Sequence, residues 1–534
     1  MERINIAGAG LAGLSAAIHL AQLGVRTNLI SVLPSERAQS VLAEGGINAA
    51  LNTMGEDDKV EYHFEDTMKG GVNLADPNAV AGLTGGAPEI VLWLKDLGAP
   101  FQMEGDRMIQ RNFGGQKKKR TAYAKSSTGK ILMTTLIDEA RKYEAKGLIT
   151  RYKNHEILRV HISDKCEGLH IRNTYTDEYI FCPGKVLLAI GGMNGIFPGK
   201  TTGTVKNTGN LTAGLFTQGL EMANLEFIQY HPTTVSIPGK RLLISEAARG
   251  EGGRLFTYRN GEKWYFMEEF YPELGNLMPR DVVSREIYNV TSMEDCSGHV
   301  YLDLTHLPAG TWENKLSDMR EEIIEYLSVD PVKDPVEVSG GIHFFMGGIK
   351  VDEAHRTNIP GLYAAGECAC QYHGANRLGG NSLLGAIYGG KVAAGTIFKE
   401  IEYEMEKKPE SLGKVPEGVA KDADVSNLNK EELSELLFTA LGIKRTEEQL
   451  REGLAGIETH LAKEGLTVTE RNRAILGKAM ILAALERHES RGAHYRIDFP
   501  ERDDVNFHKT TVVKFSDGDI HISYEEIPER RAEV

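Results

Sequence analysis

Cysteine is scarce in this sequence, with five residues among 534. They are Cys166, Cys182, Cys296, Cys368 and Cys370. None of them has the clustered spacing of a zinc, iron–sulfur or c-type haem site, so no metal is expected in this chain. The Cys-Ala-Cys sequence at 368–370 leaves two alternatives, a redox-active pair or buried inert thiols, and we favour the inert thiols.

Long apolar runs are missing as well. No stretch of about 18 apolar residues, the length that crosses a bilayer as a helix, occurs in the chain. The first expected strand begins at Ile4, which leaves no room for a targeting segment before it. We therefore expect a cytoplasmic protein without direct membrane insertion, which reaches a membrane only through partner subunits.

An excess of basic residues is also absent. The 61 lysines and arginines are outnumbered by 75 aspartates and glutamates, which gives a net charge of -14 at pH 7. This charge disfavours nonspecific binding to nucleic acid, although it permits a local basic site for a small anion. No nucleic-acid partner is expected.

The chain is too long for one ordinary core, so two or more domains are expected. Residues 3–8 predict a short buried strand, 14–24 a helix and 25–31 a second strand. Apolar runs at 184–192 and 358–367 predict two further strands of the same parallel sheet. This pattern indicates a Rossmann-like α/β domain.

The long segment between the last two strands predicts an inserted domain at about 226–346, which is richer in aromatic residues and turn signals. After it, the charged and proline-bearing stretch 403–425 indicates an exposed linker. Leucines at helical spacing then predict a small helical bundle. The last forty or so residues alternate in polarity, which predicts a terminal hairpin or edge strands.

Gly8, Gly10 and Gly13 form a G-x-G-x-x-G pattern after the first strand and at the start of the helix. Bare backbone lets a pyrophosphate approach closely, and the helix N-terminus favours its charge. This context favours dinucleotide binding over a plain glycine turn in a tightly packed unit. NAD usually has an acidic ribose partner at the end of the second strand, but this strand ends at Ser31, so the ribose contact stays open.

Two further glycine-rich turns lie far apart, at 43–48 and at 375–390. NAD does not need them, whereas a flavin ring needs backbone at close approach. Further motifs follow along nearly the whole chain, namely FGGQKKKRTAYAKSSTGK, EFIQYHPTT, ARGEGG, MPRDVVSRE, HFFMGGI, GLYAAGE, HGANRLGGNSLL and ESRGAHYRIDFPERDD. In these motifs the sequence resembles the flavoprotein family of succinate dehydrogenases, fumarate reductases and L-aspartate oxidases.

The resemblance implies FAD as cofactor and an α/β fold made of four parts. These are a Rossmann-like FAD-binding domain (1–225 and 347–400), an inserted α+β capping domain (226–346), a C-terminal helical bundle (425–495) and a small terminal β segment (496–534). The residues implied to hold FAD are Gly8, Gly10, Gly13, Ser31, Ala43, Glu44, Gly45, Gly46, Glu367, Asn381, Ser382 and Leu383. Asn210 departs from the family, which has an acidic residue in a TGDG-like turn there, and this implies a weaker hold on the cofactor.

Gln39 is the second departure. Membrane-bound members of the family have a histidine just before the AEGG turn that is joined covalently to the flavin, and glutamine cannot form that bond. The resemblance therefore implies non-covalent FAD. It also implies a lower flavin potential, which suits fumarate reduction better than succinate oxidation.

Fumarate carries two carboxylates, so its site needs cations and donors at both ends, a hydride source and a proton source. The candidate residues are His231, Ser245, Glu246, Arg249, Arg280, His343 and Arg377, together with Phe113 in the wall. Taken singly, a histidine is more often structural and an arginine more often a surface charge. Their positions within the family motifs reverse that expectation.

By resemblance, Arg377 clamps one carboxylate, and His231, Ser245 and His343 donate hydrogen bonds to the carboxylate oxygens. Arg280 is implied to be the proton donor.

Glu246 and Arg249 match the family's proton relay to this donor, and their i, i+3 spacing puts them on one face if the segment is helical. The alternative for this pair is a structural ion pair. Closure of the capping domain on the FAD domain is expected to assemble the site and expel water.

The leading hypothesis is the flavoprotein catalytic subunit of a fumarate reductase or succinate dehydrogenase, with fumarate and succinate as substrates. Electrons are expected from a separate iron–sulfur subunit, because the chain has no motif for such a cluster. The alternative is L-aspartate oxidase, which oxidises aspartate to iminoaspartate. A flavin-binding assembly protein without turnover is disfavoured, because no catalytic residue is lost. Phe113 favours the first hypothesis, since aspartate oxidases have an acidic residue there.

Overall fold

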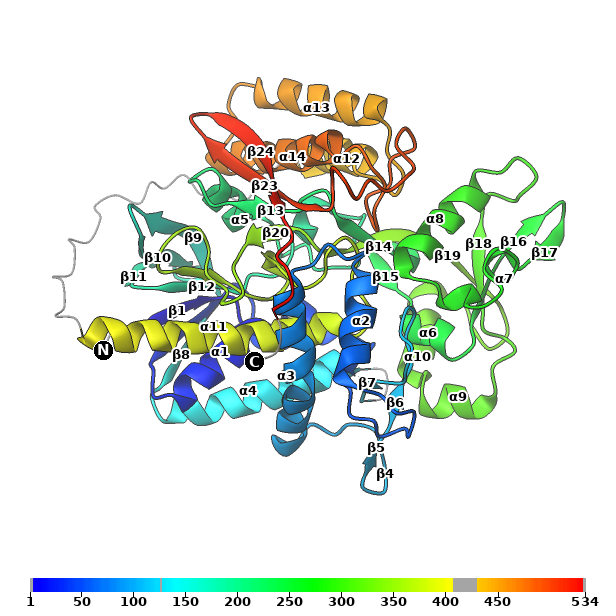
Figure 1. Cartoon of the computed structure of the whole chain (residues 1–534), viewed down its shortest axis with the longest axis horizontal. Coiled ribbons are helices and arrows are strands. Elements are labelled where there is room, and N and C mark those ends of the chain that lie inside the picture. The colour runs from blue at the N-terminus through cyan, green and yellow to red at the C-terminus, as the bar shows by residue number, and fades with distance from the viewer. Residues whose placement is uncertain (1–2, 125–126, 407–429, 532–534) are drawn as a thin grey trace.

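A five-stranded parallel sheet forms the centre of the FAD-binding part. The computed structural model describes residues 3–124, 127–406 and 430–531 (Figure 1). The strand order is β21 (Leu362–Ala364), β12 (Val186–Leu188), β1 (Ile4–Ala7), β2 (Thr27–Ser31) and β8 (Ile149–Lys153), and every pair is parallel. Strands that lie more than 170 positions apart in sequence, such as β12 and β21, are therefore neighbours in one sheet.

The two faces of this sheet belong to different cores. Ile6, Leu29 and Leu187 face a core that includes α1 (Leu11–Gln22), α4 (Thr128–Ala145) and α11 (Asn381–Glu406). Their neighbours Ile30 and Leu188 face a second core with the three-stranded sheet of β9 (His155–Ile162), β10 (Cys166–Asn173) and β11 (Tyr179–Pro183). Burial on both faces explains why these strands are continuously apolar rather than alternating.

Gly8 and Gly13 are required by close packing at the first turn. Gly8 has φ +111, and a Cβ there would overlap the carbonyl group of Ala189. A Cβ on Gly13 would overlap the carbonyl oxygen of Gly8 itself. Helix α1 can therefore start directly against the end of β1 only with glycine at both positions.

A six-stranded antiparallel sheet forms the inserted part, at the right of Figure 1. Its order is β15 (Lys240–Leu243), β14 (Ile228–Ile237), β19 (Val336–Phe345), β18 (Val300–Asp303), β16 (Arg254–Arg259) and β17 (Glu262–Trp264). Helices α6 (Glu246–Gly250), α7 (Phe266–Phe270), α8 (Arg280–Thr291), α9 (Ala309–Asn314) and α10 (Ser317–Leu327) accompany it. Strand β19 leads back through β20 (Gly348–Lys350) to β21 of the parallel sheet.

The C-terminal part contains the predicted helices and hairpin. Helices α12 (Lys430–Ala440), α13 (Glu447–Leu461) and α14 (Val468–Glu486) pack together, and α13 and α14 both begin with capping boxes. The hairpin of β23 (Lys509–Ser516) and β24 (Asp519–Glu526) extends a sheet formed with β13 (Met222–Ala223), β20 and β22 (Ala369–Cys370). The predicted linker at 403–425 lies mostly outside the described residues.

The structure thus confirms the predicted fold class, with its Rossmann-like sheet, inserted α+β part and helical C-terminal region. The four domain limits stay predictions. Among the residues that the structure describes, no helix combines the length and apolar character needed to cross a membrane.

A buried ion-pair network joins the C-terminal part to the start of β14. Arg487 Nε donates to Glu226 Oε1 at 2.7 Å and Nη1 donates to Glu489 Oε1 at 2.8 Å. All three side chains are 0% exposed. Arg445 Nη1 also donates to the carbonyl oxygen of Glu226, at 2.8 Å. Glu226 is close in sequence to the His231 motif, so this network supports the base of the candidate site.

We predict that Arg487→Met lowers the free energy of unfolding by about 3–5 kcal/mol, because it leaves the buried carboxylate of Glu226 without its ion-pair partner, whereas Glu489 keeps Arg491. Urea unfolding followed by circular dichroism measures the change. Arg451→Met is the matched control, since Arg451 pairs with Glu447 at the surface and should change stability by less than about 1 kcal/mol. Equal effects of the two substitutions would contradict the prediction.

Candidate active site

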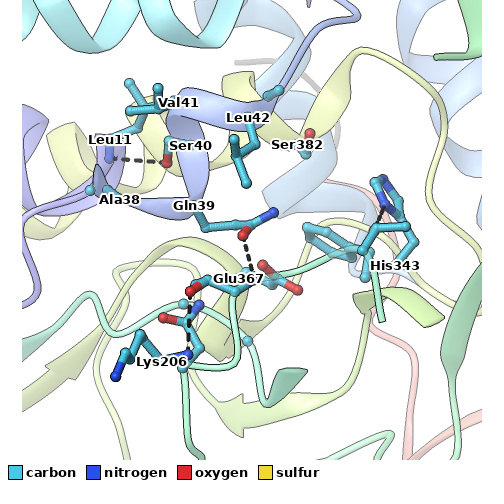
Figure 2. A pocket seen from close by; sticks show the side chains of 18 of the residues that line it. Leu11, Ala38, Gln39, Ser40, Val41, Leu42, Lys206, His343, Glu367 and Ser382 are labelled. Atoms are coloured by element: carbon cyan, nitrogen blue, oxygen red, sulfur yellow. Dashed lines mark hydrogen bonds between the residues drawn. The ribbon is translucent and has the colours of Figure 1, made fainter. Parts of the chain in front are cut away.

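One cavity of about 1080 Å³ joins the FAD-binding part to the inserted part. It begins at the turn after β1, where Gly8 and Gly10 line it, and ends at Arg280 and Arg377. The segment of Ala38 to Leu42 and the segment that contains Lys206 form two of its walls (Figure 2). A cavity lined by glycines in one part and arginines in another suits a dinucleotide and a small anion.

The first end has the features of a pyrophosphate cradle. Gly10 lies at the N-terminus of α1, and Ser31 lines the cavity at the end of β2. A Cβ on Gly10 would have only Ser40 and Ala38 within 4 Å, so the space beside this backbone is open. Gly13 does not line the cavity, because it packs against Gly8 and so supports the cradle from behind.

The middle of the cavity has a wall of small residues. Ala43, Gly45 and Gly46 line the cavity here, and so do Ser382 and Leu383 in the first turn of α11. A Cβ on Gly45 would approach the Phe113 ring to 3.0 Å, so glycine keeps this surface flat. A flat surface of this kind is suited to a flavin ring.

Two acidic residues face the same space. Burial raises the pKa of Glu367 to about 7, and Oε1 accepts a hydrogen bond from Phe345 N at 3.2 Å. Burial, together with the carboxylate of Glu322, raises the pKa of Glu44 to about 8. Both carboxyl groups therefore carry less negative charge near pH 7 than ordinary glutamates do.

The side chain of Asn381 does not line the cavity, although the residue belongs to a predicted cofactor motif. It is 0% exposed, and its Oδ1 accepts from Asn48 Nδ2 at 2.7 Å. Its Nδ2 donates to Thr67 Oγ1 at 2.9 Å, and His63 Nε2 lies 3.0 Å from its Oδ1. Asn381 therefore fixes the start of α11, so that its neighbours Ser382 and Leu383 can line the wall.

Gln39 links two segments that line the cavity, its own and the one that contains Thr204. Its Oε1 accepts a hydrogen bond from Thr204 N at 2.6 Å, which Figure 2 shows as a dashed line. Asn210, the other departure from the family pattern, also lines the cavity, and its buried Oδ1 has no hydrogen-bond partner among the described residues. The open cradle, the flat wall and this unpaired oxygen all fit a bound FAD.

Arg280 and Glu246 form a buried ion pair at the other end. Arg280 Nε and Nη2 both donate to Glu246 Oε2, at 2.8 and 2.6 Å. Arg249 Nη2 lies 3.7 Å from Glu246 Oε1, since the two residues are one turn apart in α6. The expected shared face is therefore present, and Glu246 lies between two guanidinium groups. Arg249 itself does not line the cavity.

Arg377 and the two histidines surround the remaining space. Arg377 is 3% exposed and lies over the Phe344 ring at 4.4 Å, and no described carboxylate forms a salt bridge with it. The rings of His231 and His343 are 5.1 Å apart. Ser245 lines the same space and caps α6, accepting from Ala247 N at 3.3 Å. The structure therefore brings together all the candidate residues of the substrate end.

The electrostatics of this cluster favour an anion. Three buried guanidinium groups, those of Arg249, Arg280 and Arg377, surround one carboxylate, that of Glu246. Burial raises the pKa of Glu246, but the charges of Arg280 and Arg249 outweigh it, so the net shift is downward.

Burial and the charge of Arg280 lower the pKa values of Arg377, His231 and His343 well below their usual values. Both imidazoles are therefore neutral near pH 7. The cluster therefore has an excess of positive charge, which suits a dicarboxylate.

Gln229 is a site residue that the sequence reasoning missed. Its Oε1 accepts from Arg280 Nη1 at 3.2 Å, and its Nε2 donates to the carbonyl oxygen of Arg377 at 2.9 Å. One buried amide therefore links both arginines. The available signal was its spacing, since Gln229 and His231 are two apart on β14, and positions i and i+2 of a strand share a face.

Phe113 is 2% exposed and lines the cavity beneath Gly45. A Cβ on Gly379 would also approach its ring, to 3.2 Å. The ring therefore lies between two glycine turns from distant parts of the chain. It gives the site an apolar wall at this point.

Comparison with known proteins gives consistent matches over the whole chain. The FAD binding domain family matches residues 4–383, and the family described as fumarate reductase flavoprotein C-term matches 430–533. The succinate dehydrogenase flavoprotein subunit of Bacillus subtilis is 38% identical, over 98% of this chain and 95% of the relative.

Two further relatives come from fumarate reductases. One subunit of the CoM/CoB fumarate reductase of Methanothermobacter marburgensis is 33% identical, over 93% of this chain and 94% of its own length. A variant of E. coli quinol fumarate reductase FrdA has a similar structure, with a TM-score of 0.86, 29% identity and coverage of 100% of this chain and 97% of that one.

We predict that a flavin bound in this cavity is released completely by acid, because the amide of Gln39 has no nucleophilic ring nitrogen. The measurement is the flavin absorbance of the supernatant and of the washed pellet after acid precipitation. A pellet that keeps its yellow colour and shows flavin fluorescence in a denaturing gel would contradict this prediction.

Proposed function

Because the chain belongs to the succinate dehydrogenase and fumarate reductase flavoprotein family, and so is an FAD-dependent oxidoreductase, we propose that it is a catalytic subunit that interconverts fumarate and succinate. The observation that carries this proposal is the buried cluster of Arg280, Arg377, His231 and His343 beside the flavin cradle. Its excess positive charge suits a dicarboxylate and would be costly without one.

When bound, FAD supplies the hydride that reduction of the double bond requires. Arg377 holds one carboxylate with its planar fork, and Ser245, His231 and His343 hold the carboxylate oxygens. Arg280 gives a proton to the substrate carbon opposite the hydride. The inserted part covers this space, so that its closure on the FAD-binding part excludes water from the reacting groups.

A guanidinium is a weak acid in water, with a pKa above about 12, so its position and proton supply must compensate. Glu246 contacts both Nε and Nη2 of Arg280 and faces Arg249 on its other oxygen. We propose that Arg249 and Glu246 pass a proton inward to Arg280 after each turnover. The alternative is a purely structural ion pair, which would hold Arg280 in place without supplying protons.

The source of the electrons is inferred from the relatives of this chain, which are named as subunits of larger enzymes. Those at 38% and 33% identity are both named as subunits of their enzymes. We propose that a separate iron–sulfur subunit brings electrons to this chain, and that any membrane association comes through partner subunits. Gln39 favours reduction of fumarate as the direction, since non-covalent flavin implies a lower potential.

The alternative, L-aspartate oxidase, is not favoured. Aspartate brings an ammonium group, whose burial costs several kcal/mol without an acceptor or anion beside it. Phe113 presents an apolar ring at the place where those enzymes have an acidic residue. Burial raises the pKa of Glu44 to about 8, so this carboxyl group offers less negative charge to an ammonium group than an ordinary glutamate does.

We predict that Arg280→Ala lowers the rate of fumarate reduction by at least about a hundredfold, because a positioned acid contributes that much or more. The FAD content should stay unchanged, since Arg280 lies at the arginine-rich end of the cavity. The assay uses reduced viologen as the electron donor, and flavin absorbance measures the cofactor.

Arg259→Ala is the control, because Arg259 lies on the same inserted part and pairs with Asp295 at the surface. It should keep the activity of the unmodified protein. If Arg280→Ala keeps more than a few per cent of the rate, another group donates the proton and this assignment is wrong.

We further predict that L-aspartate is oxidised at least roughly a hundredfold less efficiently than succinate, which corresponds to about 2.7 kcal/mol of lost transition-state binding. The measurement compares the two kcat/KM values with the same dye acceptor. A higher value for aspartate would support the oxidase alternative and would show that Phe113 does not select the substrate.

A further inference from the structure

The segment from Thr201 to Thr204 is held in place by protein contacts alone. Thr202 N donates to the carbonyl oxygen of Ile342 at 2.9 Å, which ties the segment to strand β19. Thr201 Oγ1 donates to Asn194 Oδ1 at 2.8 Å, and Thr204 N donates to Gln39 Oε1 at 2.6 Å. Contacts on both sides therefore set the position of Thr202 before any ligand binds.

Thr202 lies beside a substrate-end histidine. Its Oγ1 is 2.8 Å from Nδ1 of His343, and both residues line the cavity. Within the described part of the chain, the Thr202 hydroxyl has no other hydrogen-bond partner, and neither has the His343 ring. The hydroxyl therefore interacts with this ring alone, and it donates to Nδ1 in one tautomer of the ring and accepts from it in the other.

A neutral imidazole has one N–H, on either Nδ1 or Nε2. Burial and the charges of Arg280 and Arg377 keep His343 neutral, as its lowered pKa indicates. If the Thr202 hydroxyl donates to Nδ1, then Nε2 carries the hydrogen and can donate to a carboxylate. In the other tautomer, Nε2 would present a lone pair to the carboxylate, which is repulsive.

His231 shows why this choice depends on Thr202. The backbone N–H of Thr233 points at Nδ1 of His231 at 3.3 Å, and a backbone N–H can only donate. The Thr233 hydroxyl donates to the carbonyl oxygen of Ile244 at 2.8 Å. The tautomer of His231 is therefore set by a backbone N–H, whereas the tautomer of His343 depends on the Thr202 hydroxyl, which a single substitution removes.

We propose that Thr202 is a positioning residue that donates to Nδ1 of His343, holds the ring in its Nε2–H tautomer, and thereby sets the affinity of the site for dicarboxylates. The inference rests on the proposed function, because it assumes an anionic substrate. It adds a residue that touches neither the reacting atoms nor the predicted flavin motifs, and whose role is to fix a hydrogen atom.

Thr202→Val tests this proposal, because valine keeps the shape of the side chain and removes the hydroxyl. In the FAD-loaded protein, we expect the Kd for succinate and malonate and the KM for fumarate to rise about tenfold, the usual effect of one lost hydrogen bond at a buried group. The Kd is measured from the change in flavin absorbance on titration. We expect kcat to change less than KM, and FAD content to be unchanged.

Two matched variants separate the hydroxyl from the packing of the segment. Thr202→Ser keeps the hydroxyl and should restore the Kd to within about threefold. Thr134→Val removes an exposed hydroxyl on α4 that donates to the carbonyl oxygen of Lys130 at 2.9 Å and lies outside the cavity, so it should bind dicarboxylates normally.

An unchanged Kd in Thr202→Val overturns the proposal, and so does a raised Kd that Thr202→Ser fails to restore or that Thr134→Val shares. Loss of FAD from Thr202→Val would equally overturn it, since the effect would then come from the cofactor. If the unmodified protein binds no dicarboxylate in the same titration, the proposed function itself is wrong and this inference fails with it.

Discussion

The carboxylate of Glu246 is the contact on which the substrate end of the cavity depends. One oxygen accepts two hydrogen bonds from Arg280, and the other accepts from Gly114 N at 3.2 Å and faces Arg249. Arg280 begins α8 of the inserted part, whereas Gly114 belongs to the FAD-binding part. A single buried charge therefore joins the two parts and neutralises one of the three arginines. Removing it would leave three buried guanidinium groups without this carboxylate.

This contact also explains two glycine motifs that sequence reasoning attributed to the flavin family as a whole. A Cβ on Gly114 would lie 2.8 Å from Glu246 Oε1, and a Cβ on Gly379 would lie 2.9 Å from Oε2. Both glycines come from the FAD-binding part, one from FGGQ and one from RLGGN. Their absent side chains make room for the carboxylate, so the two motifs accommodate the pair of Glu246 and Arg280 as well as the cavity wall.

The parts of the fold that sequence predicted well are those that local pattern determines. Periodicity placed the strands and helices near Gly8, and the helical spacing of Glu246 and Arg249 placed them one turn apart. Contacts between distant segments were not predictable in this way. Gln229 bridges two arginines that lie 51 and 148 positions away, and Asn381 turns from the cavity toward His63 and Thr67, 318 and 314 positions away. No periodicity encodes such pairings, because they depend on how the sheets pack.

Gln39 has a structural role besides the absence of a covalent bond to flavin, because it contacts the segment that leads toward His343. Its amide accepts from Thr204 N, and Thr204 follows Thr202 by two residues in the segment paired with Ile342 beside His343 (Figure 2). The segment that contains Gln39 is therefore hydrogen-bonded to the segment whose Thr202 contacts His343. A histidine at position 39 that was bonded to flavin would not offer the same acceptor to Thr204. The departure from the covalent pattern thus places a side-chain amide where it can stabilise the segment that carries Thr202, the residue that we propose positions His343.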